Sequence, residues 1–125
     1  MRQIPAPGEK PLYWIGTSLR DLKRLEPEVH QALGSALSVA QYGRMHPSAK
    51  PWKGEGPGVF EVVEDFRGDT FRAVYTVRFA KAVYALHVFQ KKSPHGIVTK
   101  KSDVTLIGQR LKLARQHHEE NYGPE

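Results

Sequence analysis

Cationic side chains dominate the residues of this sequence that could carry out chemistry. Arg72 lies in a stretch of alternating residue types, and its guanidinium could clamp two phosphate oxygens at once. Residues 90–102 contain no carboxylate, and their basic side chains are those of Lys91, Lys92, His95, Lys100 and Lys101. A lysine attracts phosphate as a point charge, and an imidazole can exchange a proton near neutral pH. These residues indicate a site for a phosphate-containing ligand.

The acidic side chains are close together in sequence but are not expected to form a metal site. In a strand, alternation would send Glu61 and Asp65 to one face of the sheet and Glu64 to the other. We interpret this group, which also includes Asp69, as a solvated edge. The sequence has no cysteine, which excludes disulfides, zinc ribbons and thiol nucleophiles.

A glycine- and proline-rich segment, residues 43–58, supplies further candidates for binding a nucleic acid. Lys50 and Lys53 could hold its backbone, and Trp52 could stack on a base. The alternative for Trp52 is a lid over the hydrophobic core. Arg67, in a predicted turn, and Arg78, at the end of a predicted strand, could add phosphate contacts.

Two polar residues in the predicted strands have a simpler interpretation. His87 alternates with Val83, Ala85 and Phe89, so we interpret it as a half-buried histidine satisfied by a hydrogen bond. A role as acid or base is its alternative. Tyr75 is expected to pack in the core.

Hydrophobic periodicity predicts an α+β domain that positions these residues. The expected elements are a strand (12–15), two helices (17–25 and 27–43), three antiparallel strands (59–66, 71–79 and 83–89) and a helix that begins at Ser102 and frays from His117. Thr17 or Ser18 is expected to cap the first helix. We expect the helices on one side of the sheet and the other face partly open, where Arg72, Arg78 or the basic segment could line it.

Length and composition restrict the class of protein. The chain has 125 residues, 39% of them hydrophobic, which suffices for one domain with one core. We expect a flexible arm over residues 1–10, the domain over 11–118 and a tail over 119–125. The net charge of +6 favours a polyanionic partner. Neither a signal sequence nor an apolar run of membrane-spanning length is present, which predicts a soluble, cytoplasmic protein.

Three motifs, in order along the chain, resemble those of a known family. They are Phe71-Arg72-Ala73-Val74-Tyr75, His87-Val88-Phe89-Gln90-Lys91-Lys92 and Leu106-Ile107-Gly108-Gln109-Arg110-Leu111. The segments Trp14–Ser18 and Lys50–Gly54 fit the same pattern. Together, over roughly residues 10–116, they resemble the phage-related branch of the RelE/HigB-like toxins of type II toxin–antitoxin systems.

This resemblance implies a RelE-like α+β fold, with an antiparallel sheet, an N-terminal helix hairpin and a C-terminal helix. It implies an mRNA interferase, a metal-independent endoribonuclease that cleaves messenger RNA on the ribosome without a cofactor. Its partner would be an antitoxin with a helix-turn-helix domain, of the HigA type. The catalytic residues would be Arg72, Lys91, Lys92 and His95, and the RNA contacts Lys50, Trp52, Lys53, Arg67, Arg78, Lys100 and Lys101.

Cleavage without a metal needs a base for the ribose 2′-hydroxyl, cationic donors for the phosphorane and an acid for the leaving 5′-oxygen. A lysine with an ordinary pKa near about 10.4 is a poor base at neutral pH, but cationic neighbours can lower that pKa. Many family members have a basic residue after the glutamate of the first meander strand, whereas Glu61-Val62-Val63 has none. Arg67, Arg72 or Lys91 would then supply that charge, and the acid–base pair stays open.

Two other functions fit the same residues. A ParE-like toxin of the same superfamily poisons DNA gyrase and cleaves no RNA. A phage accessory protein could bind nucleic acid without catalysis. The basic segment and Arg72 favour the ribonuclease over the gyrase poison, because a gyrase-binding protein needs a docking surface and not cations around one phosphate.

Overall fold

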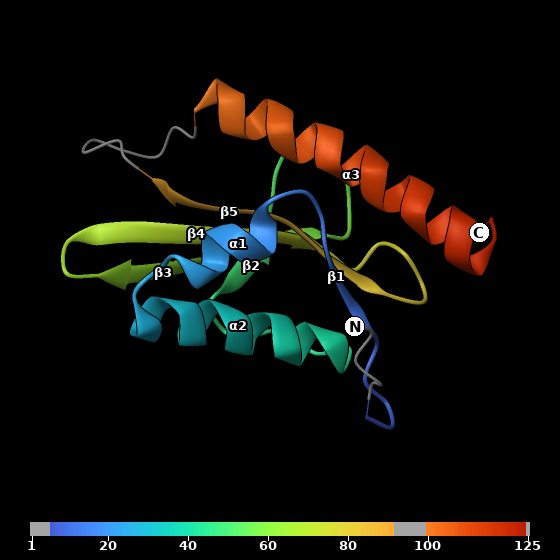
Figure 1. The fold of residues 1–125 in the computed structure, drawn as a ribbon, viewed down its shortest axis with the longest axis horizontal. Helices are drawn as coiled ribbons and strands as arrows, with labels where there is room; N and C mark the ends of the chain where they lie inside the picture. The colour runs from blue at the N-terminus through green and yellow to red at the C-terminus, as the bar shows by residue number, and fades with distance from the viewer. Residues whose placement is uncertain (1–5, 92–99, 125) are drawn as a thin grey trace.

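The centre of the fold is a five-stranded sheet with helices on both faces (Figure 1). The computed structural model describes residues 6–91 and 100–124. In chain order the elements are β1 (Leu12–Trp14), α1 (Ser18–Lys23), α2 (Pro27–Gln41), β2 (Ala49–Pro51), β3 (Val59–Phe66), β4 (Asp69–Thr76), β5 (Val83–Lys91) and α3 (Lys101–Tyr122). The strands lie in the order β1-β5-β4-β3-β2. The expected α+β class is confirmed.

The predicted antiparallel meander forms the middle of the sheet. β3 pairs with β4, and β4 with β5, both antiparallel, whereas β1 runs parallel to β5 at one edge. Arg67 and Gly68 join β3 to β4, with φ angles of 51° and 85°. Two successive positive φ angles are those of a type I′ turn, whose twist matches that of the flanking strands.

The glycine- and proline-rich segment, residues 43–58, in which we expected neither helix nor strand, contains a fifth strand. Residues Ala49–Pro51 pair antiparallel with β3, which places Lys50 opposite Glu61. Three residues ending in proline give no alternating pattern, so the sequence did not reveal this strand. Proline is tolerated because β2 is the outer strand of the sheet, where one side of the backbone needs no ladder hydrogen bond.

α1 and α2 cover one face of the sheet and bury the expected apolar stripe. Pro27 suits the first turn of α2, where the N–H that it lacks would have no partner. The buried residues of α2 are Val29, Leu33, Ala36, Leu37 and Ala40. They pack against alternate residues of the sheet, including Val62, Phe71, Ala73, Tyr75, Ala85 and Val88. The predicted core position of Tyr75, which is 1% exposed, is confirmed.

α3 covers the opposite face, so the expectation that the helices lie on one side was wrong. Its residues Ile107, Leu111 and Ala114 belong to a second core with Val74, Tyr84 and Leu86. Among the described residues, Ile15, Trp52 and Phe79 join α3 in burying this face, and the β3–β4 hairpin extends past the first turn of α3 (Figure 1). None of the helices in the described part of the chain is long and apolar enough to cross a membrane.

The end of α3 is ordered, although we expected fraying from His117 and a tail from residue 119. The helix continues to Tyr122. His118 is 2% exposed and accepts a hydrogen bond from the Lys81 N–H (3.1 Å), and His117 Nδ1 lies 2.8 Å from the Tyr84 hydroxyl oxygen. These contacts anchor the last turns to the segment before β5 and to β5 itself.

A β-bulge in β5 changes which side chains face α3. Val74 of β4 pairs with His87, but the next residue, Tyr75, pairs with Ala85, so Leu86 is an extra residue in β5. Side chains of a strand point alternately to its two faces, and one extra residue reverses this order beyond it. His87 therefore faces α3, whereas Ala85 faces α2. The expectation that His87 shares a face with Val83 and Ala85 was therefore wrong.

A buried arginine joins α3 to β5 and to the start of α1. The Arg110 guanidinium donates to the Leu86 carbonyl (3.0 Å) and to Thr17 Oγ1 (3.1 Å), and it is in contact with Gly16. Thr17 Oγ1 in turn donates to Asp21 Oδ2 (2.7 Å). The expected hydroxyl caps are absent at both helices concerned: α1 has no side-chain cap, and α3 begins at Lys101, before Ser102, without one.

Gly16 leaves the space that this arginine occupies, which gives a test of the fold. Its φ is +59°, and a Cβ there would lie 2.8 Å from Arg110 Nε. We expect Gly16→Ala to lower the free energy of unfolding by about 2–4 kcal/mol, because strain and a clash with a buried guanidinium add together. The measurement is urea denaturation followed by circular dichroism.

Gly68→Ala is the matched control, since Gly68 also has a positive φ (+85°) but nothing within 4 Å of its added Cβ. Strain alone should cost about 1 kcal/mol there. Equal losses in the two variants would show that the contact with Arg110 contributes nothing.

Candidate functional site

Three cationic side chains from three strands lie near one carboxylate, that of Glu61, on the α3 face of the sheet. Lys50 of β2 lies opposite Glu61 of β3, and Arg72 of β4 lies opposite Val63, two residues farther along β3. Lys91 of β5 lies opposite Thr70, two residues before Arg72. We call Lys50, Arg72 and Lys91 the cationic cluster. These three side chains meet because β2, β3, β4 and β5 are successive strands of the sheet and the side chains point to the same face.

Glu61 is the centre of this arrangement and is 5% exposed. Its Oε1 lies 3.2 Å from an Arg72 Nη and 3.5 Å from Lys50 Nζ. The interpretation of Glu61 as part of a solvated edge was wrong, because strand β2 and its lysine cover it. A carboxylate removed from water needs such partners, since an uncompensated buried charge costs several kcal/mol, of order 3–5 when one partner is lost.

Arg72 forms an ion pair with Glu61 across the β3–β4 hairpin. The pair is not at the surface, because the side chain of Arg72 is only 11% exposed. Its Nε is buried and has no hydrogen-bond partner among residues 6–91 and 100–124. The guanidinium is thus held in a fixed orientation by one carboxylate oxygen and retains an unused donor, which a phosphate group close to it could engage after a small movement.

Lys91 lies in a setting that makes its ammonium group more acidic. Partial burial, together with the positive charges of Arg72 and Lys50, lowers its pKa below the ordinary lysine value, while Glu61 opposes the shift. Arg72 and Lys50 repel the positive charge of Lys91, so loss of the Lys91 proton relieves this repulsion and the pKa falls. A larger fraction of Lys91 is therefore neutral near physiological pH than of a solvated lysine.

The cluster carries more positive than negative charge. Three cations near one carboxylate leave a surplus of positive charge, which a bound anion would reduce. Within residues 6–91 and 100–124, no group of three His, Asp or Glu side chains is placed to hold a metal ion. Asp65, which shares this face, is engaged as an acceptor from Thr70 Oγ1 (2.8 Å).

His87 lies on the same face but has both ring nitrogens occupied. Nε2 is 2.8 Å from Asp103 Oδ1, and Nδ1 is 3.3 Å from an Arg110 Nη. Because arginine can only donate, Nδ1 accepts and Nε2 carries the proton donated to Asp103. The favoured interpretation of His87 as a histidine satisfied by hydrogen bonds is confirmed, and its 6% exposure places it in the α3 interface.

Three of the predicted RNA contacts lie outside the cationic cluster and are engaged in contacts within the chain. Trp52 is 7% exposed and packs in the core under α3, so the lid interpretation holds and its ring is not free to stack on a base. The Arg78 guanidinium donates to the carbonyls of Pro57 and Glu55 and holds that loop. Arg67 lies in the hairpin turn with its guanidinium 5.0 Å from the Phe66 ring centroid, away from the cluster.

The remaining predicted residues stay as predictions. Lys53, Lys100 and Lys101 are exposed, the last two at the start of α3. Lys92 and His95 lie outside the described residues. The residue whose role sequence reasoning missed is Glu61. The signal was present as an acid between Val59 and Val63 in an apolar strand, but its lysine partner comes from the strand that could not be recognised.

Replacing Glu61 tests the electrostatics of the cluster. In Glu61→Gln the negative charge that raises the pKa of Lys91 is lost, so this pKa should fall further below the ordinary value. The measurement is a pH titration of the lysine side-chain resonances by NMR. Glu64→Gln is the matched control on the opposite face of β3 and should leave Lys91 unchanged. A rise of the Lys91 pKa in Glu61→Gln would contradict the arrangement.

The described geometry can be compared with known proteins. The sequence matches the family of phage-derived Gp49-like proteins over residues 20–112. The fold is similar to that of the Escherichia coli toxin RelE, solved as a double arginine-to-alanine mutant in the free state, with 17% identity and a TM-score of 0.54 over 84% of this chain and 97% of that one. A toxin–antitoxin complex, RelBE2 of Mycobacterium tuberculosis, gives 21% identity and a TM-score of 0.44 over 74% of this chain and 100% of the other.

No curated protein matches the sequence. The family match covers most of the chain, including all of the cationic cluster, and the phage-related branch indicated by the sequence motifs is confirmed. This chain belongs to the phage-derived Gp49-like family and has the fold of the RelE toxins.

Proposed function

We propose that this chain is the toxin of a toxin–antitoxin pair and cleaves messenger RNA on the ribosome as a metal-independent endoribonuclease. The observation that carries the proposal is the cationic cluster, in which Arg72 is fixed by Glu61 and the pKa of Lys91 is lowered. The RelE-type fold supports it, because the structure similar to this chain is that of a toxin. The net charge of +6 suits a polyanionic substrate.

The chemistry assigned to the cluster is an intramolecular transesterification at a phosphodiester of RNA. The 2′-oxygen attacks the adjacent phosphorus while the bond to the 5′-oxygen breaks, which leaves a 2′,3′-cyclic phosphate and a 5′-hydroxyl. Lys91 in its neutral form takes the 2′-hydroxyl proton, and Arg72 stabilises the negative charge that develops on the phosphorane. Lys50, whose side chain is 61% exposed, binds the backbone from solvent.

The acid for the leaving oxygen is expected from Lys92 or His95, which follow Lys91 in the chain. The antitoxin partner, of the HigA type with a helix-turn-helix domain, belongs to the same proposal. Lys53, Lys100 and Lys101 would add contacts to RNA that depend on charge and not on sequence.

Induced expression with mapping of RNA 5′ ends tests this function. Wild type should arrest growth and produce new 5′ ends inside translated messages, and Lys91→Gln should not. For Arg72→Ala the cleavage rate should fall by about 10²–10³, the scale for removal of one preorganised donor. A loss below about fivefold would remove Arg72 from the mechanism.

The controls separate loss of chemistry from loss of fold. Arg72→Ala leaves Glu61 buried with only an exposed lysine, so the double variant Arg72→Ala/Glu61→Gln, which has no unpaired charge, must show the same loss of cleavage. Growth arrest with intact RNA would indicate another target such as gyrase. Modest, salt-dependent weakening of RNA binding without cleavage would indicate a binding protein.

A further inference from the structure

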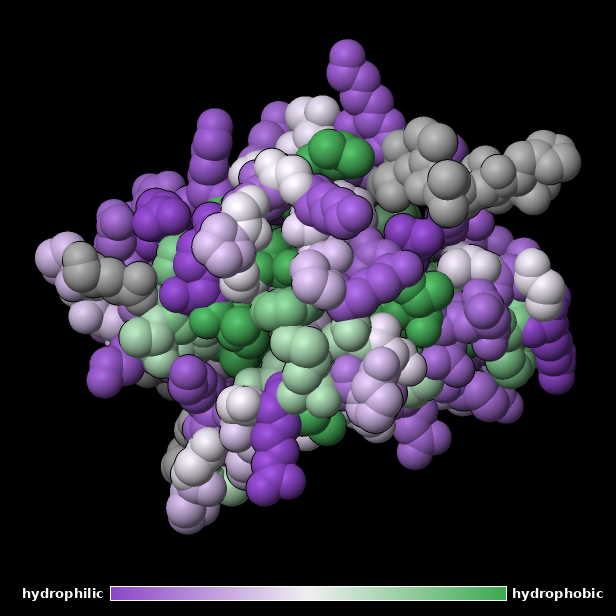
Figure 2. Space-filling model, turned by 180° about the vertical axis from the view of Figure 1, so that it is seen from behind, coloured by the Kyte–Doolittle hydropathy of each residue, from purple (hydrophilic) through white to green (hydrophobic). Residues whose placement is uncertain are grey.

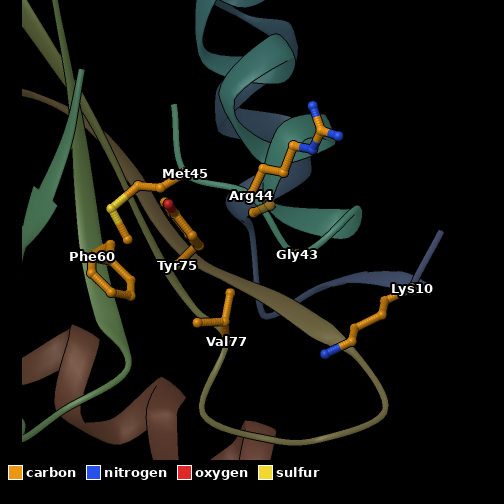
Figure 3. A pocket seen from close by; sticks show the side chains of 8 residues that line it. Lys10, Gly43, Arg44, Met45, Phe60, Tyr75 and Val77 are labelled. Atoms are coloured by element: carbon orange, nitrogen blue, oxygen red, sulfur yellow. The ribbon is translucent and has the colours of Figure 1, made fainter. Parts of the chain in front are cut away.

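A pocket on the other face of the sheet is not used by the proposed chemistry. It lies where α2 ends and has a volume of about 250 Å³. Its apolar walls come from Ala40, Met45, Phe60, Tyr75 and Val77, which belong to α2, the loop after it, β3, β4 and the segment that follows β4 (Figure 3). Phe60 precedes Glu61 in β3, so the two residues point to opposite faces and the pocket is separate from the cationic cluster.

The floor of the pocket is buried and one wall is exposed. Tyr75 and Ala40 are 1% and 2% exposed, and the rings of Phe60 and Tyr75 lie 5.8 Å apart. Met45, which is 51% exposed, extends toward Phe60 and Tyr75 across the opening (Figure 3). Methionine can change its rotamer at little cost, so it could make room for an incoming side chain.

A wider hollow adjoins this pocket and extends the apolar surface. It has a volume of about 530 Å³, is lined by Val39 and Tyr42, and shares Arg44 with the first pocket. Tyr42 is 47% exposed. Figure 2 shows hydrophobic side chains reaching the surface near the middle of one face, within a hydrophilic border. Exposed apolar area of this kind marks sites of contact with other molecules.

The charges at the rim define the chemistry of the occupant. Lys10 and Arg44 line the first pocket, which has no carboxylate in its lining, and neither cation forms an ion pair within the described residues. Lys10 reaches toward Val77 across the pocket, and the Arg44 guanidinium points away from it, beside α2 (Figure 3). Glu9 interacts with the Tyr42 hydroxyl at the edge of the wider hollow.

We propose that this surface binds a short amphipathic segment of an acidic partner protein. One large apolar side chain would enter the pocket between Met45, Phe60 and Val77, and carboxylates beside it would pair with Lys10 and Arg44. The apolar walls favour a protein over a nucleic acid, whose phosphates would find more cations at the cluster on the other face. The surface gives the antitoxin of the proposed function a docking place, but its ligand chemistry does not depend on RNA cleavage.

The test uses two synthetic 14-residue peptides with the same leucine and phenylalanine positions, one with glutamate and one with lysine at the others. Each is titrated into the isotope-labelled full chain and followed by NMR. The glutamate peptide should shift the resonances of Lys10, Arg44, Met45 and Val77, and the lysine peptide should not. Met45→Glu should weaken the binding about tenfold, because it places a charge in an apolar contact and repels the peptide.

Leu113→Glu is the matched control, because Leu113 is also 51% exposed but lies on α3. It should bind the glutamate peptide as wild type does. Shifts centred on Lys50, Arg72 and Lys91, or no localised shifts at all, would overturn the proposal. So would shifts that appear on raising the concentration of the chain alone, since these would assign the surface to self-association. None of these results bears on whether the chain cleaves RNA.

Discussion

One extra residue in β5 determines which side chains meet on the α3 face of the sheet. Val83 and Ala85 face α2, and simple alternation would put His87, Phe89 and Lys91 on that side as well. The bulge at Leu86 reverses the parity, so all three face α3 instead. His87 can then contact Asp103 and Arg110 of α3, and Lys91 comes close to Arg72. The attachment of the C-terminal helix and the assembly of the cationic cluster thus depend on the same irregularity.

The position of Arg72 follows from the burial of Glu61. A carboxylate that is 5% exposed cannot be left unpaired, and both of its close cations contact the same oxygen, Oε1. This arrangement fixes the guanidinium before any ligand arrives, which is the condition for electrostatic preorganisation. The same arrangement makes function and stability hard to separate, because a variant without Arg72 keeps a buried charge whose remaining partner, Lys50, is largely solvated. Partial burial first, and then the positive charges of Arg72 and Lys50, lower the pKa of Lys91.

The elements with strong periodicity could be predicted from the sequence, whereas the features that depend on a single residue could not. The stripe of α2 and the alternation of β3 and β4 correctly placed Tyr75 in the core and Arg72 on the other face. The strand at Ala49–Pro51 is too short for a pattern, and the bulge at Leu86 has no compositional signal because the residues from Val83 to Leu86 are all hydrophobic. These two features supply the partner of Glu61 and the orientation of Lys91. Sequence reasoning therefore found the cations but assigned Glu61 to solvent and His87 to the wrong face.

The sheet separates two surfaces of different chemistry. On the α3 face the charges are concentrated around Glu61, and on the α2 face the same strands contribute Phe60 and Tyr75 to an apolar pocket. Successive residues of β3 serve both, Phe60 on one side and Glu61 on the other, so a ligand on either surface contacts the same strand without touching the other ligand. For a ligand on one surface to block binding on the other, it would therefore have to be large enough to extend around the edge of the sheet formed by β2. Because β2 has only three residues and carries Lys50, that edge is where a partner held at the end of α2 would first meet a phosphate bound at the cluster.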